Sequence, residues 1–219
     1  MATPTRVRPS LESGDHLTRE EFHARYCERP DIKKAELVEG VVYVASPVRA
    51  RAHGRPHGAM MAWLGTYQAT TPDVWLLDNA TLRLDAPNEV QPDAILFREG
   101  LDGPTVTSDD YIEGPPQIVV EIAASSVSYD LHEKKEVYRR NGVPEYVVWR
   151  TLDGAIDWFR LDSAQGQYSR VEPDERGVIE SSMFPGLRLH VPKMLAGDMA
   201  DVLAELRRPP DQPPDRSRR

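Results

Sequence analysis

Short apolar blocks, separated by polar and turn-forming residues, run along most of the chain. Such blocks, when rich in Val, Ile and aromatic residues, are typical of β-strands, and Gly, Pro, Asn and Asp between them indicate turns. Glu39-Gly40 and Asp153-Gly154 predict hairpins, and Asn88, and Gly100 with Pro104, predict a turn and a loop. Strands are predicted at 36–38, 41–45, 74–77, 81–84, 93–97, 117–122, 145–149 and 156–161, with weaker ones near Tyr168 and Ile179.

Four segments carry helical signals. Thr18 and Glu21 form a capping-box pattern, which predicts a helix from there to about Cys27. Further helices are predicted from about Pro56 to just before Pro72, over 131–140, and over about 198–206. Strands and helices interleave without an internal repeat, so the sequence predicts one α/β domain over residues 10–206.

The composition is typical of a soluble globular protein. The chain has 219 residues, 40% of them hydrophobic and 28% charged. The longest apolar run, 59–64, is far shorter than the roughly 20 residues that a membrane span needs, so no membrane association is expected. Nothing near Met1 has the apolar stretch of a secretory signal. Cys27 is the only cysteine, which excludes an intrachain disulfide and favours the reducing cytoplasm.

The net charge of −8 argues against a protein that coats nucleic acid through charge alone, because that mode relies on many Lys and Arg side chains. It does not exclude an enzyme that meets phosphates locally. Residues 207–219 differ from the rest: they are basic and rich in proline, and are predicted to be disordered. The tail is either a solubilising terminus or a weak nucleic-acid tether.

Glu121 lies inside the apolar strand predicted at 117–122. Strand alternation places it on the same face as Val119 and Ala123. A carboxylate on so apolar a strand is unfavourable unless it is ion-paired, hydrogen-bonded or bound to a metal. A solvated strand face and a structural ion pair are the alternatives to a functional role.

Asp93 is the second carboxylate of interest. Pro92-Asp93 is an ordinary turn dipeptide, so strand-entry capping alone explains it. Its value is as a partner of Glu121, because Mg²⁺ takes hard oxygen ligands and uses only one or two carboxylates beside water and phosphate. Two carboxylates on adjacent strands meet that requirement.

Lys134 lies on the apolar side of the helix predicted at 131–140. At about 100° per residue it falls in the middle of the stripe formed by Leu131, Tyr138 and Val137. The ammonium could snorkel outward along its stem. However, only five of the 27 basic residues are lysines, so a lysine at an inward position indicates a need for a compact ammonium. Asp130 with Glu133 is interpreted as a capping box at the start of this helix, and a place for Asp130 at the site is the alternative.

These residues together resemble the bacterial Uma-type restriction endonuclease family, a branch of the PD-(D/E)-x-K nuclease superfamily. Their order, spacing and flanking strands agree, and the resemblance extends from Glu36 to the FPG segment at 184–186. The matching positions are Pro92-Asp93, Glu121 after Ile118-Val119-Val120, the segment 130–134, Tyr138 and the segment 142–146.

The resemblance implies a restriction endonuclease-like mixed β-sheet flanked by helices, with Asp93 and Glu121 as metal ligands. Glu36 matches an acidic position that reaches the same site. The superfamily's usual lysine would stand at Ala123. The Uma-type branch is thought to supply this amine from the following helix, which corresponds to Lys134.

The leading hypothesis is therefore a Mg²⁺- or Mn²⁺-dependent phosphodiesterase acting on nucleic acid, with DNA the expected substrate. Asp93, Glu121 and the backbone carbonyl of Ile122 would hold the metal, and Lys134 would position the attacking water. A catalytically silent nuclease-like module that binds a protein or nucleic-acid partner is the rival, and the acidic charge supports it. A serine hydrolase is disfavoured, because the chain has no G-x-S-x-G motif.

Two further expectations concern histidines and assembly. The spacing of His53 and His57 would suit zinc on one helix face, but Pro56 indicates that the helix starts between them, which favours loop or helix-end contacts. His57 beside the acidic site is the other option. The apolar strands at 146–149 and 156–159 are offered as an interface, and a homodimer is predicted.

Overall fold

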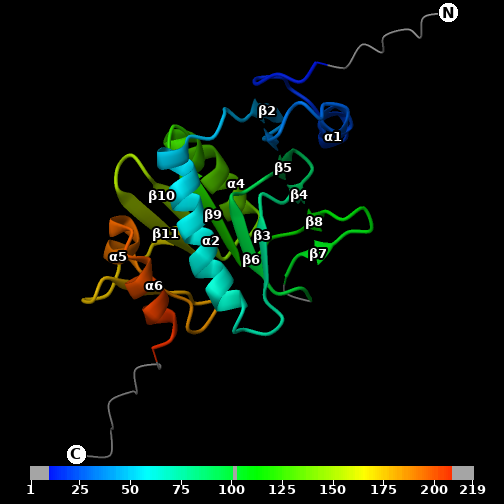
Figure 1. Cartoon of the computed structure of the whole chain (residues 1–219). Helices are drawn as coiled ribbons and strands as arrows, with labels where there is room; N and C mark the ends of the chain where they lie inside the picture. Colours follow the sequence, from blue (N-terminus) through cyan, green and yellow to red (C-terminus); the bar gives the residue numbers. More distant parts are fainter. Residues whose placement is uncertain (1–9, 101–102, 209–219) are drawn as a thin grey trace, which may run out of the picture.

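Two six-stranded sheets, each with one parallel pair of strands, organise the computed structural model, which describes residues 10–100 and 103–208 (Figure 1). The first sheet has the order β2-β1-β5-β4-β8-β7 and the second β12-β11-β10-β9-β6-β3. The first contains β1 (Ala35–Val38), β2 (Val41–Val44), β4 (Leu82–Asp85), β5 (Asn88–Val90), β7 (Thr105–Val106) and β8 (Ile112–Glu113). The second contains β3 (Trp75–Asp78), β6 (Ala94–Phe97), β9 (Ile118–Ala123), β10 (Glu145–Arg150), β11 (Ala155–Asp162) and β12 (Gln167–Arg170).

A small antiparallel pair, β13 (Val178–Glu180) with β14 (Arg188–His190), and eight helical segments complete the described chain. Two of these segments are π-helical and continue directly into α-helices. The segments are α1 (Arg19–Cys27), η1 (Ala50–Gly54), α2 (Arg55–Gln68), α3 (Val127–Tyr129), η2 (Asp130–Lys134), α4 (Lys135–Arg140), α5 (Val191–Ala196) and α6 (Met199–Leu206).

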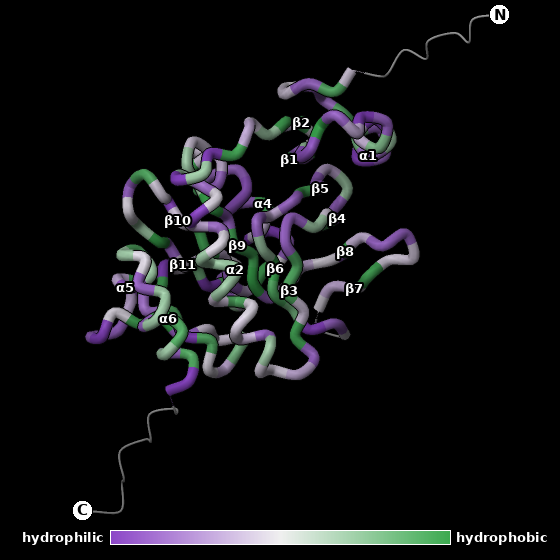
Figure 2. The backbone as a smooth tube through the Cα atoms, viewed as in Figure 1, coloured by the Kyte–Doolittle hydropathy of each residue, from purple (hydrophilic) through white to green (hydrophobic). Residues whose placement is uncertain are grey.

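The second sheet is covered on both faces. Side chains of α2, α5 and α6 pack on one face, together with Ile118, Val120 and Ile122 of β9. The other face, which carries Val119 and Ala123, packs against α4 and the first sheet. Figure 2 shows hydrophobic residues along β6 and β9 in the middle of the molecule. The predicted mixed α/β fold flanked by helices is confirmed, with its strands divided between two sheets.

Several local predictions hold because they rest on short-range chemistry. Thr18 caps α1, and its side chain and that of Glu21 form the predicted capping box. Glu39 and Gly40 adopt φ angles of 54° and 76°, as the tight turn between β1 and β2 requires. β9 is an interior strand with the predicted alternation of faces.

Other predictions were wrong at the ends of elements. Asn88, predicted as a turn, begins β5, and the turn lies at residues 86–87 instead. The helix predicted at 131–140 starts earlier, at Val127. The sequence analysis missed β7, β8, β14 and α5, which have two to six residues each and therefore show little periodicity.

The surface predicted for dimerisation is inside the fold. Residues 146–149 and 156–159 lie on β10 and β11, and every one of them is buried. Hydrogen-bonded neighbours flank both strands, and packed side chains cover both faces, so the prediction of an interface there was wrong. Within the described ranges, no helix has the length and apolar character to cross a bilayer. Residues 209–219, most of the predicted basic tail, lie outside the described residues.

Glu145 anchors the loop before β14 and provides a test of the fold. Its buried carboxylate accepts hydrogen bonds from the hydroxyl groups of Ser181 and Ser182, the amide of Ser182 and the Nε of Arg160. Glu145→Ala leaves these donors unpaired, so we expect a loss of about 3 kcal/mol in the free energy of unfolding, measured by urea denaturation. Glu172→Ala, at an exposed ion pair with Arg170, should change it by less than about 0.5 kcal/mol. Equal losses in the two variants would contradict this role of Glu145.

Candidate active site

The candidate site lies where β1, β9 and the η2–α4 helix meet. β6 and β9 pair with Ala94 opposite Val120, and one further step of that register places Asp93 opposite Glu121. Residues opposite each other in an antiparallel pair project from the same face of the sheet. Both carboxylates therefore lie on the face that packs against the first sheet.

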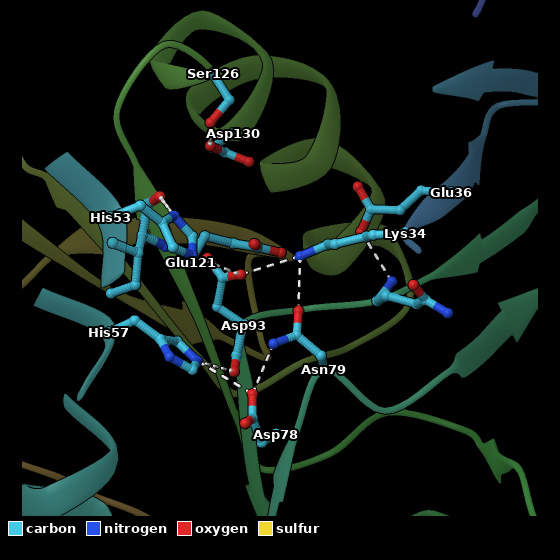
Figure 3. A network of polar contacts seen from close by, with 12 residues as sticks. Lys34, Glu36, His53, His57, Asp78, Asn79, Asp93, Glu121, Ser126 and Asp130 are labelled. Carbon is cyan, nitrogen blue, oxygen red and sulfur yellow. Dashed lines mark hydrogen bonds and ion pairs between the residues drawn. The ribbon is translucent and has the colours of Figure 1, made fainter. Parts of the chain in front are cut away.

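Asp93 is held by two donors and lies beside the ring of His53. Its Oδ2 accepts the backbone N–H of Ile122 at 2.7 Å, its Oδ1 lies 3.0 Å from the Lys34 Nζ, and the His53 Nε2 lies 3.5 Å from the same oxygen (Figure 3). Burial raises the pKa of Asp93, but Lys34, His53 and the Ile122 amide more than offset it, so the pKa falls below its usual value. The carboxylate is thus ionised and fixed in position.

Lys134 points inward, as the helical periodicity predicts. Its side chain is 2% exposed, and its Nζ lies 2.8 Å from the Glu36 Oε1 and 2.5 Å from the Glu121 Oε1. Burial lowers the pKa of Lys134, but the surrounding carboxylates raise it well above its usual value. The Tyr138 hydroxyl donates to the same Glu121 oxygen at 2.8 Å, and the amide of Gln91 donates to Glu36. Lys134 therefore joins Glu36 and Glu121 into one buried ion cluster.

The cluster contains more negative than positive groups. Burial and nearby carboxylates raise the pKa of Glu121 to about 8, against the opposing effect of Lys134. Burial likewise raises the pKa of Asp130 to about 6. Two lysines, Lys34 and Lys134, face four buried carboxylates, those of Glu36, Asp93, Glu121 and Asp130.

Asp130 does not cap a helix, so that interpretation was wrong. It lies one turn inside the continuous helical segment that begins at Val127, and its carboxylate accepts the Ser126 hydroxyl at 2.6 Å. The helical segment begins at Val127, four residues after the last residue of β9. Asp130 is therefore buried beside the cluster, where its charge acts on Lys134 and Glu121.

The sequence analysis missed Lys34 and the contacts of His53. Lys34 directly precedes β1 and lies on the same face as Glu36, two residues later, so strand alternation carries both to the site. Its Nζ also lies 3.0 Å from the Asn79 Oδ1. The scarcity of lysine, which drew attention to Lys134, could have pointed to Lys34 as well.

The two histidines stack on each other beside the acids, with ring centroids 5.6 Å apart. The His57 Nε2 lies 3.1 Å from the backbone carbonyl of Asp93 and 3.1 Å from the Asp78 Oδ1. The structure thus places His57 next to Asp93, and a role of His57 at the site stays a prediction. Among the described residues, no group of three or more His, Cys, Asp or Glu side chains is arranged to hold a metal ion, which gives the zinc alternative no support.

The chemistry of the donors at this site nevertheless fits Mg²⁺ or Mn²⁺. These ions need only one or two carboxylates together with carbonyl, water or phosphate oxygens. Asp93, Glu121 and the Ile122 carbonyl are such oxygens, and the His53 ring lies between two of them, with its Nδ1 3.0 Å from that carbonyl and its Nε2 3.5 Å from the Asp93 Oδ1. The excess of carboxylates over lysines is the electrostatic condition that a bound cation relieves.

Comparisons with known proteins agree with this fold. A family model described as "Uma2: Putative restriction endonuclease" matches residues 19–192. The crystal structure of a putative nuclease belonging to DUF820 from Anabaena variabilis ATCC 29413 is similar, with a TM-score of 0.54 and 9% identity over 78% of this chain and 90% of that chain. At that identity the likeness shows the fold alone. No curated protein matches the sequence.

Removing the Lys134 ammonium should destabilise the fold in a pH-dependent way. Lys134→Met leaves Glu36 and Glu121 buried without their cation, so we expect a loss of about 3 to 5 kcal/mol in the free energy of unfolding at pH 8. The pKa of Glu121, which Lys134 otherwise lowers, rises further in the folded variant, so the folded state binds a proton that the unfolded chain releases above pH 4 to 5. Stability of the variant should therefore fall as pH rises from 5 to 8, measured by urea denaturation in metal-free buffer.

The neighbouring Lys135→Met is the matched control. The Lys135 Nζ lies 3.6 Å from the centroid of the Phe159 ring, so its loss should change stability by about 1 kcal/mol or less. A Lys134→Met variant as stable as this control at pH 8 would contradict the buried ion cluster.

Proposed function

The chain belongs to the Uma2 family of putative restriction endonucleases, and from this premise we propose that it is a divalent-metal-dependent nuclease that hydrolyses phosphodiester bonds in DNA. The observation that carries the proposal is the buried cluster itself. Asp93 and Glu121 lie on adjacent strands, a lysine contacts each of them, and the cluster retains an excess of negative groups. Family membership supports a nuclease and suggests DNA as its substrate, and the metal is inferred from this chemistry.

We assign Asp93, Glu121 and the Ile122 carbonyl as the groups that would hold Mg²⁺ or Mn²⁺. The bound ion supplies polarisation of the phosphoryl group and a lowered pKa of water. The chain's own residues prepare the oxygens: the Ile122 amide orients Asp93, and the Tyr138 hydroxyl orients Glu121. Lys134 offsets negative charge and positions the attacking water, with Glu36 fixing its ammonium from the opposite side.

A catalytically silent binding module is the alternative function. The net charge of −8 favours it, because nucleases commonly present a basic groove to DNA. Metal binding distinguishes the two. Calorimetric titration of Mg²⁺ or Mn²⁺ into folded protein should show a site that Asp93→Asn removes, and binding that does not depend on Asp93 would favour the silent module.

Two further proposals concern assembly and location. A homodimer remains a prediction, now without the surface first offered for it, and a light-scattering mass of one chain would contradict it. A cytoplasmic location is proposed from Cys27, the only cysteine of the chain.

Cleavage of a fluorescently labelled DNA duplex with Mg²⁺ or Mn²⁺ tests the proposed chemistry. We expect Glu121→Gln and Lys134→Ala to lower the rate at least about a hundredfold, because the first removes a group that would hold the metal and the second removes a positive charge that would offset the charge on the reacting phosphate. Glu133→Gln makes the same change at an exposed position next to Lys134 and should leave the rate unchanged. Folding of each variant is checked by circular dichroism, and activity that survives Glu121→Gln would assign the chemistry to other residues.

A further inference from the structure

Most of the arginine side chains that the structure describes are engaged by other groups. Most of the described ones pair with Asp or Glu, and others donate to backbone carbonyls. Within residues 10–100 and 103–208, four guanidinium groups form no hydrogen bond or ion pair, those of Arg49, Arg51, Arg55 and Arg207. An engaged guanidinium is less available to an outside anion, so these four are the most available arginines of the described chain.

Three of the four lie in one short segment, residues 49–55. This segment consists of Arg49, η1 and the first residue of α2, at the N-terminal end of the long helix (Figure 1). Figure 3 shows His53 of this segment beside Asp93. Arg49 lies four residues before His53, and its backbone carbonyl accepts the His53 amide at 2.9 Å. Arg49 and Arg51 are both exposed, in the same short segment as His53.

Arg55 is turned to a different place. A Cβ atom added at Gly197, which caps the C-terminal end of α5, would lie 2.8 Å from the Arg55 Nη2. Its guanidinium thus lies against the α5–α6 turn. Arg207 lines a cavity with Ala69 and Thr70, beyond the far end of α2. Arg55 and Arg207 are therefore unpaired like Arg49 and Arg51, but they lie elsewhere in the fold.

We propose that Arg49 and Arg51 bind the phosphate backbone of the nucleic-acid substrate beside the active site, an inference that rests on the proposed nuclease function. A chain of net charge −8 gains little from long-range attraction to DNA, so its phosphate contacts must come from a few local cations. Guanidinium groups match phosphate oxygens in pairs, and each one that neutralises a phosphate releases counterions. Residues 49–55 provide two such guanidinium groups in the segment that carries His53, which contacts Asp93.

Fluorescence anisotropy with a labelled DNA duplex in metal-free buffer tests the proposal without requiring cleavage. The proteins compared are the full chain and its variants Arg49→Gln, Arg51→Gln, the double variant, Arg55→Gln and Arg207→Gln. The slope of log affinity against log salt is negative, and each phosphate contact contributes about −0.9 to it. We therefore expect its magnitude to be smaller by about 2 in the double variant. Between about 50 and 200 mM salt, its affinity should therefore fall about tenfold less than that of the unaltered chain. The Arg55 and Arg207 variants should keep the original slope.

The other outcomes overturn the proposal in separate ways. A double variant with unchanged binding would remove Arg49 and Arg51 from the phosphate-binding surface. Equal losses in the Arg55 and Arg207 variants would reduce the effect to overall charge. Binding of poly-L-glutamate but not of the duplex would assign the segment to an acidic protein partner, and binding of neither would leave it without an anionic ligand.

The same proteins in the cleavage assay separate this proposal from the proposed function. Duplex binding that depends on Arg49 and Arg51, without cleavage by the unaltered chain, would support the surface and contradict the nuclease. Cleavage with unchanged binding in the double variant would do the reverse.

Discussion

The ammonium of Lys134, buried between Glu36 and Glu121, is the interaction on which the site depends. It connects three elements that are distant in sequence, because Glu36 lies on β1, Glu121 on β9 and Lys134 at the end of η2. A buried charge is tolerated only when its partners are close and its remaining hydrogen bonds are satisfied. Burial of any one of these groups is therefore favourable only when the two sheets and the helix are docked together. Formation of the site is thus coupled to formation of the fold.

The sequence predicts the parts of this arrangement that depend on local periodicity. Strand alternation places Glu121 on the correct face, and helical periodicity turns Lys134 inward, each from the apolar residues around it. The short first-sheet strands β7 and β8 give no such signal, because two residues cannot show a period. Asn88 misled for a related reason: its amide is typical of turns, but here it donates to Glu39 and Asp85 from within a strand.

Contacts between distant segments were beyond sequence reasoning. Lys34 meets Asp93 across 59 positions and His53 meets the Ile122 carbonyl across 69, and neither pairing leaves a trace in the nearby residues. The two lysines also differ in a way that only the structure shows. The side chain of Lys134 is 2% exposed and that of Lys34 is 25% exposed. The side of the cluster at Lys34 is therefore the more open of the two to water and ions.

The composition of the cluster is itself an argument about function. Replacing a buried ion pair by well-packed apolar residues is often neutral or stabilising, so a core selected for stability alone has little use for four carboxylates and two lysines. The raised pKa of Glu121, about 8, shows that burial still opposes its charged form despite the contact with Lys134. The same carboxylates that weaken the metal-free fold would gain most from a divalent cation, which adds two positive charges among oxygens that are already fixed in place. The unfavourable free energy of burying these carboxylates without a metal would thus be relieved when the ion binds.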